Sequence, residues 1–236
     1  MRVIEPSVTI LDALDQQSLP IRIEFCGRIC YKSEHRIDAE SAIPFVRRMA
    51  EHGHNSVLEM GVTTYRLSCP NREVVDAFFF RQPKFLHIDR LGPEELLITG
   101  SVRAYIEMAV QHSGDAIAMA VVQRLKAEHP YFFATKTLPP CPQAATISLT
   151  KVSLAEIEHL PQEQLGRHRF LAVKFIVNRA VTHELVRHRP CTFLQESQRY
   201  CRYSADKFGN EVSFIKPLFF DVGSPEYAIW KQSMEA

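Results

Sequence analysis

The sequence predicts an α+β fold in which a twisted, mostly antiparallel sheet is flanked by helices. The first observation is an amphipathic helix over residues 38–52, whose polar side chains lie outside one apolar stripe. The stripe consists of Ala42, Phe45, Val46, Met49 and Ala50. The other two observations are strand patterns, because residues 62–67 alternate as a half-buried strand and residues 170–177 form the strongest strand candidate later in the chain.

The first part of the chain is expected to supply the start of this sheet. Residues 1–34 open with apolar side chains, followed by strand-like alternation over residues 21–25. The amphipathic helix is expected to end at Gly53, since glycine is the preferred residue just after a helix. We expect the strand over residues 62–67 to pair with the one over residues 170–177.

Between these two strands the sequence indicates a helical insertion at about residues 70–165. One helix is expected to start near Ser101, and a second to run from Asp115 to about Glu128, after a Ser-Gly break. A proline-rich linker follows, and residues 144–152 are expected to return as a strand. The insertion is therefore expected to form a lobe on one side of the sheet.

The composition limits the possible classes of protein. The 236 residues suit a single domain over residues 1–236 that carries this insertion, and 46% hydrophobic and 23% charged residues are typical of a globular protein. A formal net charge of +1 argues against a nucleic-acid polymer as partner. The six cysteines are scattered, and no apolar run is long enough to span a bilayer. We therefore expect a cytoplasmic protein with no membrane partner.

Residues 178–200 carry the densest polar chemistry of the chain. Asn178 is a candidate N-cap of a helix that must end before Pro190, because proline cannot continue the helical hydrogen bonds. One face of this helix carries Ala180, His183, Glu184, Arg187 and His188. The segment beyond the proline carries Gln195, Glu196, Ser197, Gln198, Arg199 and Tyr200. This combination is typical of an anion-binding site, and the alternative is a solvated helix end whose cations balance the helix dipole.

A second Arg-His-Arg tripeptide shows that the tripeptide alone is weak evidence. Residues 167–169 repeat it, but the residue that follows after seven intervening positions is Val177. The same gap after Arg189 leads to Ser197, which is followed closely by Arg199. The polar continuation, and not the tripeptide, carries the prediction.

The segment Arg187-His188-Arg189, seven further residues and then Ser197 resembles the signature of flavin-dependent thymidylate synthases. A second segment, Gly53–Glu59, is similar to the family's Gly-His-x-Ser/Thr-x-x-Glu motif. A third segment, Arg28–Tyr31, resembles an early family segment in which a small polar residue approaches the flavin. Cys30 occupies that position here, and we interpret it as a core thiol.

The resemblance implies reductive methylation of dUMP to dTMP, with methylenetetrahydrofolate supplying the carbon, NADPH the reducing equivalents and FAD the hydride relay. The FAD contacts it implies are His54, Ser56, Glu59, Arg187, His188, Arg189 and Pro190. The dUMP contacts it implies are Glu184, Arg187, Gln195, Glu196, Ser197, Gln198 and Arg199, with Ser197 and Arg199 suited to the phosphate. No catalytic nucleophile is needed, and the FAD sites of a homotetramer would be shared between subunits.

The sequence also departs from the family pattern. Met60 stands where many members have His, and Leu194 where many have a small residue. Members usually continue into a helix that starts with Asn-x-Arg and supplies further arginines, whereas this chain ends at Ala236. Ser101-Val-Arg103 resembles that helix start only faintly. A non-catalytic FAD- or nucleotide-binding relative that has lost the C-terminal part of the active site is therefore the alternative function.

Two other chemistries are disfavoured by spacing. His183 and His188 are five residues apart, whereas a zinc-binding helix needs two histidines four residues apart on one face, so we expect no metal site. A nucleophilic Cys191 or Cys201 would need an orienting partner, which the sequence does not indicate.

Overall fold

The computed structural model describes residues 1–188, 190–203, 205 and 211–235, which form two compact units. Unit 1 consists of Met1–Asp12, Arg28–Glu34 and Leu171–Ala236. Unit 2 consists of Ala13–Gly27 and His35–Phe170. Helices and mostly antiparallel sheets occur together, so the predicted α+β class is confirmed. The single domain with an insertion at about residues 70–165 stays a prediction.

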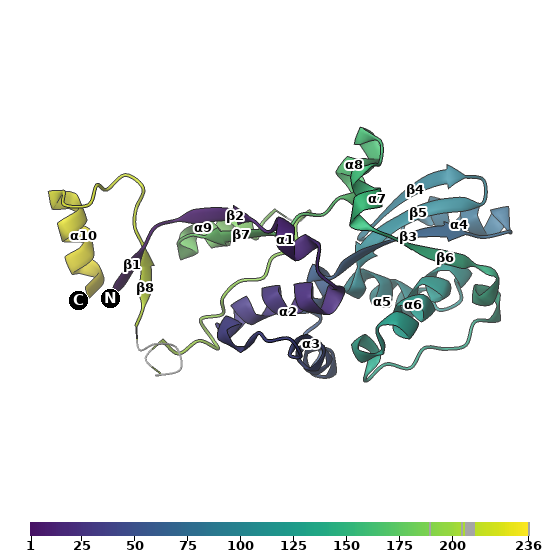
Figure 1. Ribbon diagram of the computed structural model, residues 1–236, viewed down its shortest axis with the longest axis horizontal. Helices are drawn as coiled ribbons and strands as arrows, with labels where there is room; N and C mark the ends of the chain where they lie inside the picture. The colour runs from purple at the N-terminus through teal and green to yellow at the C-terminus, as the bar shows by residue number, and fades with distance from the viewer. Residues whose placement is uncertain (189, 204, 206–210, 236) are drawn as a thin grey trace. The chain divides into compact units, whose positions relative to one another are not determined.

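The elements follow one another as labelled in Figure 1. The strands are β1 (Arg2–Ile4), β2 (Ser7–Ile10), β3 (Val62–Ser68), β4 (Leu86–Gly92), β5 (Glu95–Ser101), β6 (Ser148–Val152), β7 (Val173–Ile176) and β8 (Ser213–Ile215). The α-helices are α1 (Asp12–Asp15), α2 (Leu19–Cys30), α3 (Ala42–Glu51), α4 (Arg72–Arg81), α5 (Val102–Gln111), α6 (Ala116–Glu128), α7 (Leu154–Glu158), α8 (Gln162–His168), α9 (Arg179–Leu185) and α10 (Pro225–Glu235). The 3₁₀ helices are η1 (Glu34–Arg36), η2 (Asn55–Met60), η3 (Pro130–Phe133) and η4 (Pro142–Thr146). Among the described residues, no helix combines the length and apolarity needed to cross a membrane.

Unit 2 is built on a four-stranded antiparallel sheet with the strand order β4-β5-β3-β6. β3 pairs with β5 along its whole length and with β6 on its other side. The predicted pairing of residues 62–67 with residues 170–177 is therefore wrong, because both edges of β3 are already occupied. β7 instead pairs with β2 in unit 1, where Val8 lies opposite Phe175.

The central strand β5 is buried on both of its faces. Leu96 and Ile98 lie on the face covered by α5 and α6, which pack side by side (Figure 1). Tyr105 of α5 is fully buried there and donates its hydroxyl hydrogen to backbone carbonyls of β3 and β5. Leu97 lies on the opposite face, in a cluster with Val152 and with apolar residues of α7 and α8. Each face of the sheet therefore has its own apolar core.

Local sequence signals start most of the helices. The Ser101 side chain accepts from the Ala104 N–H at 3.1 Å, and the Asp115 side chain accepts from the Ala118 N–H at 2.8 Å. These caps confirm the two predicted helices. The amphipathic helix is also confirmed as α3, and Gly53 follows it with φ +70, a conformation that glycine adopts without strain.

The prediction of strand-like structure over residues 21–25 is wrong, because these residues belong to α2. Ile23 and Cys26 are buried at helical spacing. A Cβ atom on Gly27 would lie 2.7 Å from Val57 Cγ1 and 2.8 Å from Phe45 Cε1, so a small residue is required where α2 meets its neighbours. Five alternating residues fit both a strand and one side of a helix, and this tertiary packing decides between them.

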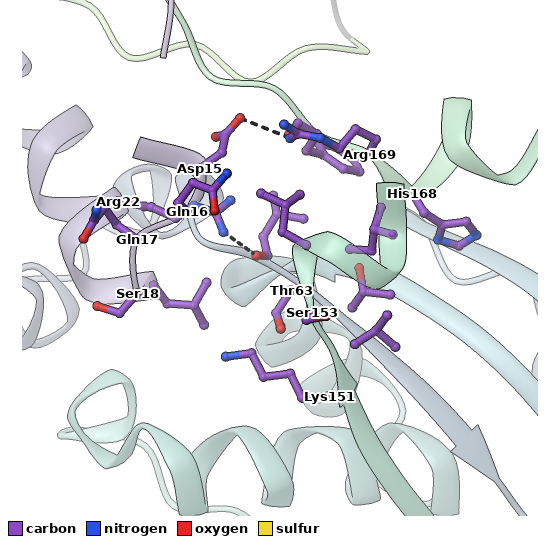
Figure 2. A pocket seen from close by; sticks show the side chains of 17 residues that line it. Asp15, Gln16, Gln17, Ser18, Arg22, Thr63, Lys151, Ser153, His168 and Arg169 are labelled. Carbon is purple, nitrogen blue, oxygen red and sulfur yellow. Dashed lines mark hydrogen bonds and ion pairs between the residues drawn. The ribbon is translucent and has the colours of Figure 1, made fainter. Parts of the chain in front are cut away.

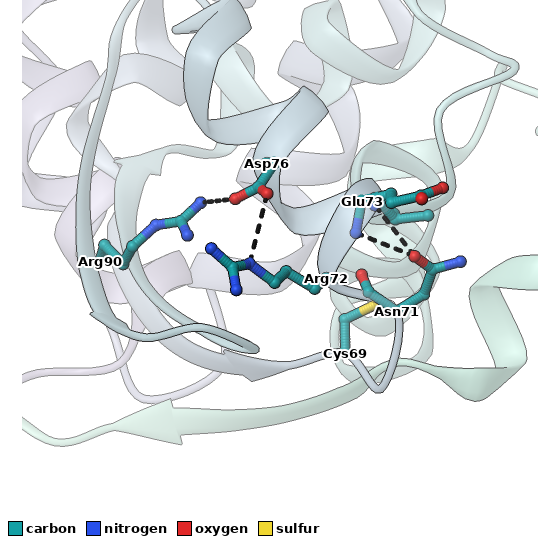
Figure 3. A network of polar contacts seen from close by, with 7 residues as sticks. Cys69, Asn71, Arg72, Glu73, Asp76 and Arg90 are labelled. Atoms are coloured by element: carbon teal, nitrogen blue, oxygen red, sulfur yellow. Dashed lines mark hydrogen bonds and ion pairs between the residues drawn. The ribbon is translucent and has the colours of Figure 1, made fainter.

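A polar network fixes α4 beside the edge of the sheet (Figure 3). The Asn71 side chain accepts from the backbone N–H groups of Glu73 at 3.0 Å and Val74 at 3.3 Å, which starts the helix. Asp76 of α4 then pairs with Arg90 of β4 at 2.5 Å. The N-cap and this ion pair together set the position of α4.

The described residues of unit 1 form two small sheets, the helices α9 and α10, and the last residues of α2. β1 pairs with β8 in parallel, and β2 pairs with β7 in antiparallel orientation. α9 follows β7 in the chain, and α10 follows β8. The polar segment over residues 178–200 therefore belongs to unit 1.

Candidate functional site

The helix predicted ahead of Pro190 is present as α9. Asn178 is its N-cap, since the side-chain oxygen accepts from the Val181 N–H at 3.0 Å. The regular helix ends at Leu185, and one further turn follows, in which the Arg187 N–H donates to the Glu184 carbonyl at 3.0 Å. Glu184 and Arg187 are both exposed, so their charged groups are available at the end of the helix.

The next predicted residues continue at the surface of unit 1. His188 and Pro190 are exposed, and the His188 carbonyl accepts from the Cys191 N–H at 3.0 Å. The prediction for Arg189 lies outside the described residues. The described part of the Arg-His-Arg-Pro segment is thus a solvent-facing turn with an arginine and an imidazole.

The segment that carries Ser197 is fixed to the early segment around Cys30. The Ser197 N–H donates to the Cys30 carbonyl at 3.0 Å, and the Cys201 N–H donates to the Ser197 carbonyl at 2.9 Å. The rings of Tyr31 and Tyr200 meet edge to face, with their centroids 5.3 Å apart. Two segments that resemble the same family, and lie more than a hundred residues apart in the sequence, are therefore brought together within unit 1.

Two hydrogen bonds orient the amide and carboxylate at the start of this segment. Gln195 donates from Nε2 to the Thr182 hydroxyl of α9 at 3.0 Å. Glu196 accepts from the Tyr203 hydroxyl. Burial, followed by the hydrogen bond to Glu196, raises the pKa of Tyr203, so the hydroxyl stays protonated and acts as the donor. Lys32 lies over the Tyr203 ring, with Nζ 4.9 Å from the ring centroid.

The remaining predicted dUMP contacts are exposed. Gln198 and Arg199 lie in a turn that leads to Tyr200. Sequence reasoning missed Tyr203 and Lys32 as supports of the segment. The available signal for Tyr203 was a phenolic hydroxyl three residues beyond the predicted segment, whereas nothing in the sequence marked Lys32.

Cys30 does not have the character of a nucleophile. Burial raises the pKa of its thiol, and the nearby Cys201 acts in the same direction. A thiol with a raised pKa carries little thiolate at neutral pH, and the thiolate is the reactive form. The backbone carbonyl of Cys30, which accepts from Ser197, is the part that organises this site.

The other predicted FAD contacts lie in unit 2, in or beside η2. The His54 N–H donates to the Met49 carbonyl at 2.9 Å, while Ser56 is exposed. Glu59 pairs with Arg103 of α5 at 2.5 Å. Asn55 has a buried Oδ1 that meets no hydrogen-bond donor within the part of the chain that the structure describes. This segment therefore combines an imidazole, an exposed hydroxyl and an orphaned acceptor.

These donor sets fit a cofactor with phosphate and ribose groups. In unit 2, Ser56 offers a hydroxyl donor and Asn55 an acceptor that lacks a partner among the described residues. In unit 1, Arg187 and His188 offer exposed cationic and imidazole groups. The predicted flavin contacts are thus divided between the two units, with His54, Ser56 and Glu59 in unit 2.

The site in unit 1 is a turn with exposed cationic side chains on an α+β fold, held by hydrogen bonds to α9 and to the Cys30 segment. Residues 152–236 match the model of the family described as thymidylate synthase complementing protein. The match includes residues 187–199 and supports, for this part of the chain, the assignment to the thymidylate synthase-related family that these residues predicted. A comparison with curated proteins found no match. Gly53–Glu59 lies outside the matched range, so its resemblance stays a prediction.

Proposed function

We propose that the chain acts in the flavin-dependent synthesis of dTMP, in which dUMP is reductively methylated with methylenetetrahydrofolate as carbon donor and NADPH as reductant. The family match over residues 152–236 supports a thymidylate synthase-related enzyme. The observation that carries the proposal is the hydrogen bond from the Ser197 N–H to the Cys30 carbonyl. This hydrogen bond fixes the signature segment, residues 187–199, to the Arg28–Tyr31 segment, which carries the same family resemblance. Arg199 stays exposed beside it.

In this proposal the signature segment holds dUMP. Arg199 and Ser197 bind the phosphate by charge-assisted hydrogen bonds. Glu196, oriented by Tyr203, and Gln195, oriented by Thr182, present fixed acceptors and donors to the rest of the nucleotide. The other proposed dUMP contacts are Glu184, Arg187 and Gln198. The protein groups position and neutralise the substrate, and no side chain is required to attack it.

Bound FAD would supply the hydride relay of this reaction. The residues proposed to hold it are His54, Ser56, Glu59, Arg187, His188, Arg189 and Pro190. Exposed cations suit its phosphates, and the exposed Ser56 hydroxyl suits a phosphate or ribose oxygen. We further propose a homotetramer in which neighbouring subunits contribute to each flavin site, and a cytoplasmic location.

Two measurements on the purified protein test the reaction. Absorption of oxidised flavin in the visible spectrum tests FAD binding, and release of tritium from labelled dUMP in the presence of NADPH and methylenetetrahydrofolate tests turnover. We expect both. Flavin absorption without tritium release at any enzyme concentration would refute the catalytic proposal, and would favour a non-catalytic FAD- or nucleotide-binding relative. The absence of both signals would refute either function.

The substrate site is tested by Arg199→Ala. We expect dUMP binding to weaken by roughly 1.5–3 kcal/mol, the typical loss of a hydrogen bond to a charged group. Equilibrium dialysis with labelled dUMP measures the change. Arg47→Ala, which removes an exposed arginine from α3, is the matched control and should leave the dissociation constant unchanged. An unchanged constant in Arg199→Ala as well would remove this arginine from the site.

A further inference from the structure

Unit 2 contains a cavity of about 270 Å³ that the proposed reaction does not use. It lies between the residues that lead into α2, the start of β3, the end of β6 and residues 168–170 (Figure 2). All of the residues that line it belong to unit 2. The cavity is therefore complete within this unit, and none of the residues proposed to bind dUMP or FAD lines it.

The cavity wall carries more positive than negative charge. Its cations are Arg22, Lys151 and Arg169, and its carboxylate is Asp15. Asp15 is buried and pairs with Arg169 at 3.1 Å, and Glu158 also approaches Arg169, at 3.4 Å. The charge of Arg169 is thus compensated within the protein, while Arg22 and Lys151 keep the net charge around the cavity positive.

Arg22 is held in a poorly solvated position. Its Nη1 donates to the Val62 carbonyl at 3.1 Å, which is a neutral acceptor. Burial lowers the pKa of this guanidinium, and Asp15 opposes that shift. A cation that has lost part of its hydration gains more from a bound anion than a fully solvated one does.

The N-terminus of α2 adds to the positive potential. The Ser18 carbonyl accepts from the Arg22 N–H at 3.1 Å, so the helix begins directly after Ser18. Ser18 and Leu19 both line the cavity, which places the positive end of the helix dipole at its wall. Figure 2 shows Lys151 on the other side, extending from β6, while the ring of His168 points away from the other labelled side chains.

We propose that this cavity binds the phosphate group of a small phosphorylated molecule. The positive charge of Arg22 and Lys151 attracts a phosphate monoester, and the Ser18 hydroxyl and the free N–H groups at the N-terminus of α2 are the donors proposed for its oxygens. The volume lies just below the range of roughly 300–1,000 Å³ for sites that hold drug-sized ligands. The cavity therefore suits a small phosphate ester and is too small for a dinucleotide such as FAD.

Calorimetric titration of the full chain with inorganic phosphate tests the proposal. All titrations use the Arg199→Ala background, because phosphate is also expected to bind at the proposed dUMP site and this substitution weakens that site. The result therefore does not depend on the proposed function. We expect saturable binding that weakens about tenfold or more in Lys151→Gln, as for a lost charge-assisted hydrogen bond. Lys151 is exposed, so its replacement should not disturb folding. Lys84→Gln, an exposed lysine outside the cavity, is the matched control and should bind phosphate as tightly as the background protein.

A parallel titration with sodium acetate at the same ionic strength tests the choice of phosphate over carboxylate. We expect acetate to bind much more weakly, because it offers fewer oxygens and less charge. The proposal is overturned if phosphate gives no saturable signal, if Lys151→Gln binds phosphate as tightly as the control, or if acetate binds equally well.

Discussion

A buried chain of polar groups in unit 2 makes Thr99→Val the most informative single substitution. The Thr99 hydroxyl lies 2.6 Å from the Thr64 hydroxyl and 2.7 Å from His168 Nδ1. His168 Nε2 in turn lies 3.3 Å from Asp89 Oδ2. Neutral His168, with its proton on Nε2 facing Asp89, allows Nδ1 to accept from Thr99, which accepts from Thr64. This series of polar groups joins β3, β5, β4 and α8, and Thr99 connects Thr64 on one side with His168 and Asp89 on the other.

The cost of the substitution follows from the burial of these groups. Thr99 is 0% exposed, Thr64 2% and His168 1%, so water cannot replace the lost hydroxyl. Valine keeps the branched shape but leaves the His168 nitrogen without a donor and the Thr64 hydroxyl without its acceptor. Each stranded group costs roughly 1–3 kcal/mol. Because the Thr64 hydroxyl can rotate toward another acceptor, we expect the free energy of unfolding to fall by roughly 2–4 kcal/mol.

Urea denaturation followed by circular dichroism measures this loss. Tryptophan fluorescence is unsuited, because the single tryptophan, Trp230, lies in unit 1. Hydrogen exchange of the β3 and β5 amides localises the effect to the sheet of unit 2. Thr150→Val, on the exposed edge strand β6, is the control and should change stability by less than about 0.5 kcal/mol. Equal urea midpoints for the Thr99→Val protein and the wild type would refute the reasoning.

Two further predictions concern the buried imidazole and the support of Glu196. Burial lowers the pKa of His168 in the folded protein, so the unfolded chain binds the proton more readily. The stability that depends on neutral His168 should therefore be fully present above the ordinary histidine pKa of about 6.5. It should fall as the pH drops from there through the lower pKa of the folded state. Urea titrations across this range should show a smaller pH dependence in His168→Gln, and an identical dependence would contradict the assignment. Tyr203→Phe keeps the ring beneath Lys32 but removes the hydroxyl that holds Glu196, so the dissociation constant for dUMP should rise several-fold, whereas Tyr227→Phe in α10 should not change it. Equal constants in the two variants would show that the hydroxyl does not position Glu196 for binding.

The parts of the fold that sequence reasoning predicted are those decided by a few neighbouring residues. Asn178, Ser101 and Asp115 each precede a helix and accept a backbone hydrogen bond in its first turn, so the N-cap pattern was sufficient. Gly53 ended the amphipathic helix for an equally local reason, its positive φ. Signals of this kind act within one turn of the chain and do not depend on tertiary contacts.

The errors arose where distant residues decide the structure. The hairpin formed by β4 and β5 was not predicted, because Leu96–Gly100 is buried on both faces and therefore lacks the alternation of a half-buried strand. The partner of residues 62–67 was wrong, since the pattern that marks a strand does not identify its neighbour. The structure also shows that residues 70–165 supply three strands of the main sheet in addition to their helices.

The site shows the same division. Residues 187–199 were predicted as a site because their chemistry is unusual for a helix end and turn; the family match includes this range, and the roles of the residues stay a prediction. The hydrogen bond from Ser197 to Cys30 could not be predicted, because it joins two segments through backbone atoms that carry no sequence signal. Tyr203 and Lys32 were missed for a related reason, since they act on Glu196 and on each other and not through a motif.

The ion pair between Glu59 and Arg103 bears on whether Glu59 can serve a ligand. Arg103 Nη1 lies 2.5 Å from Glu59, and Arg103 Nε lies 2.6 Å from Glu107, so two carboxylates share one guanidinium. If Glu59 turned to accept from a ribose hydroxyl, Arg103 would keep Glu107 as its partner and would not be left as an unpaired cation. Both side chains of the Glu59–Arg103 pair are partly exposed, which further lowers the cost of separating them. The pair therefore holds Glu59 in place without excluding the role proposed for it, and the double partnership of Arg103 is what permits the exchange.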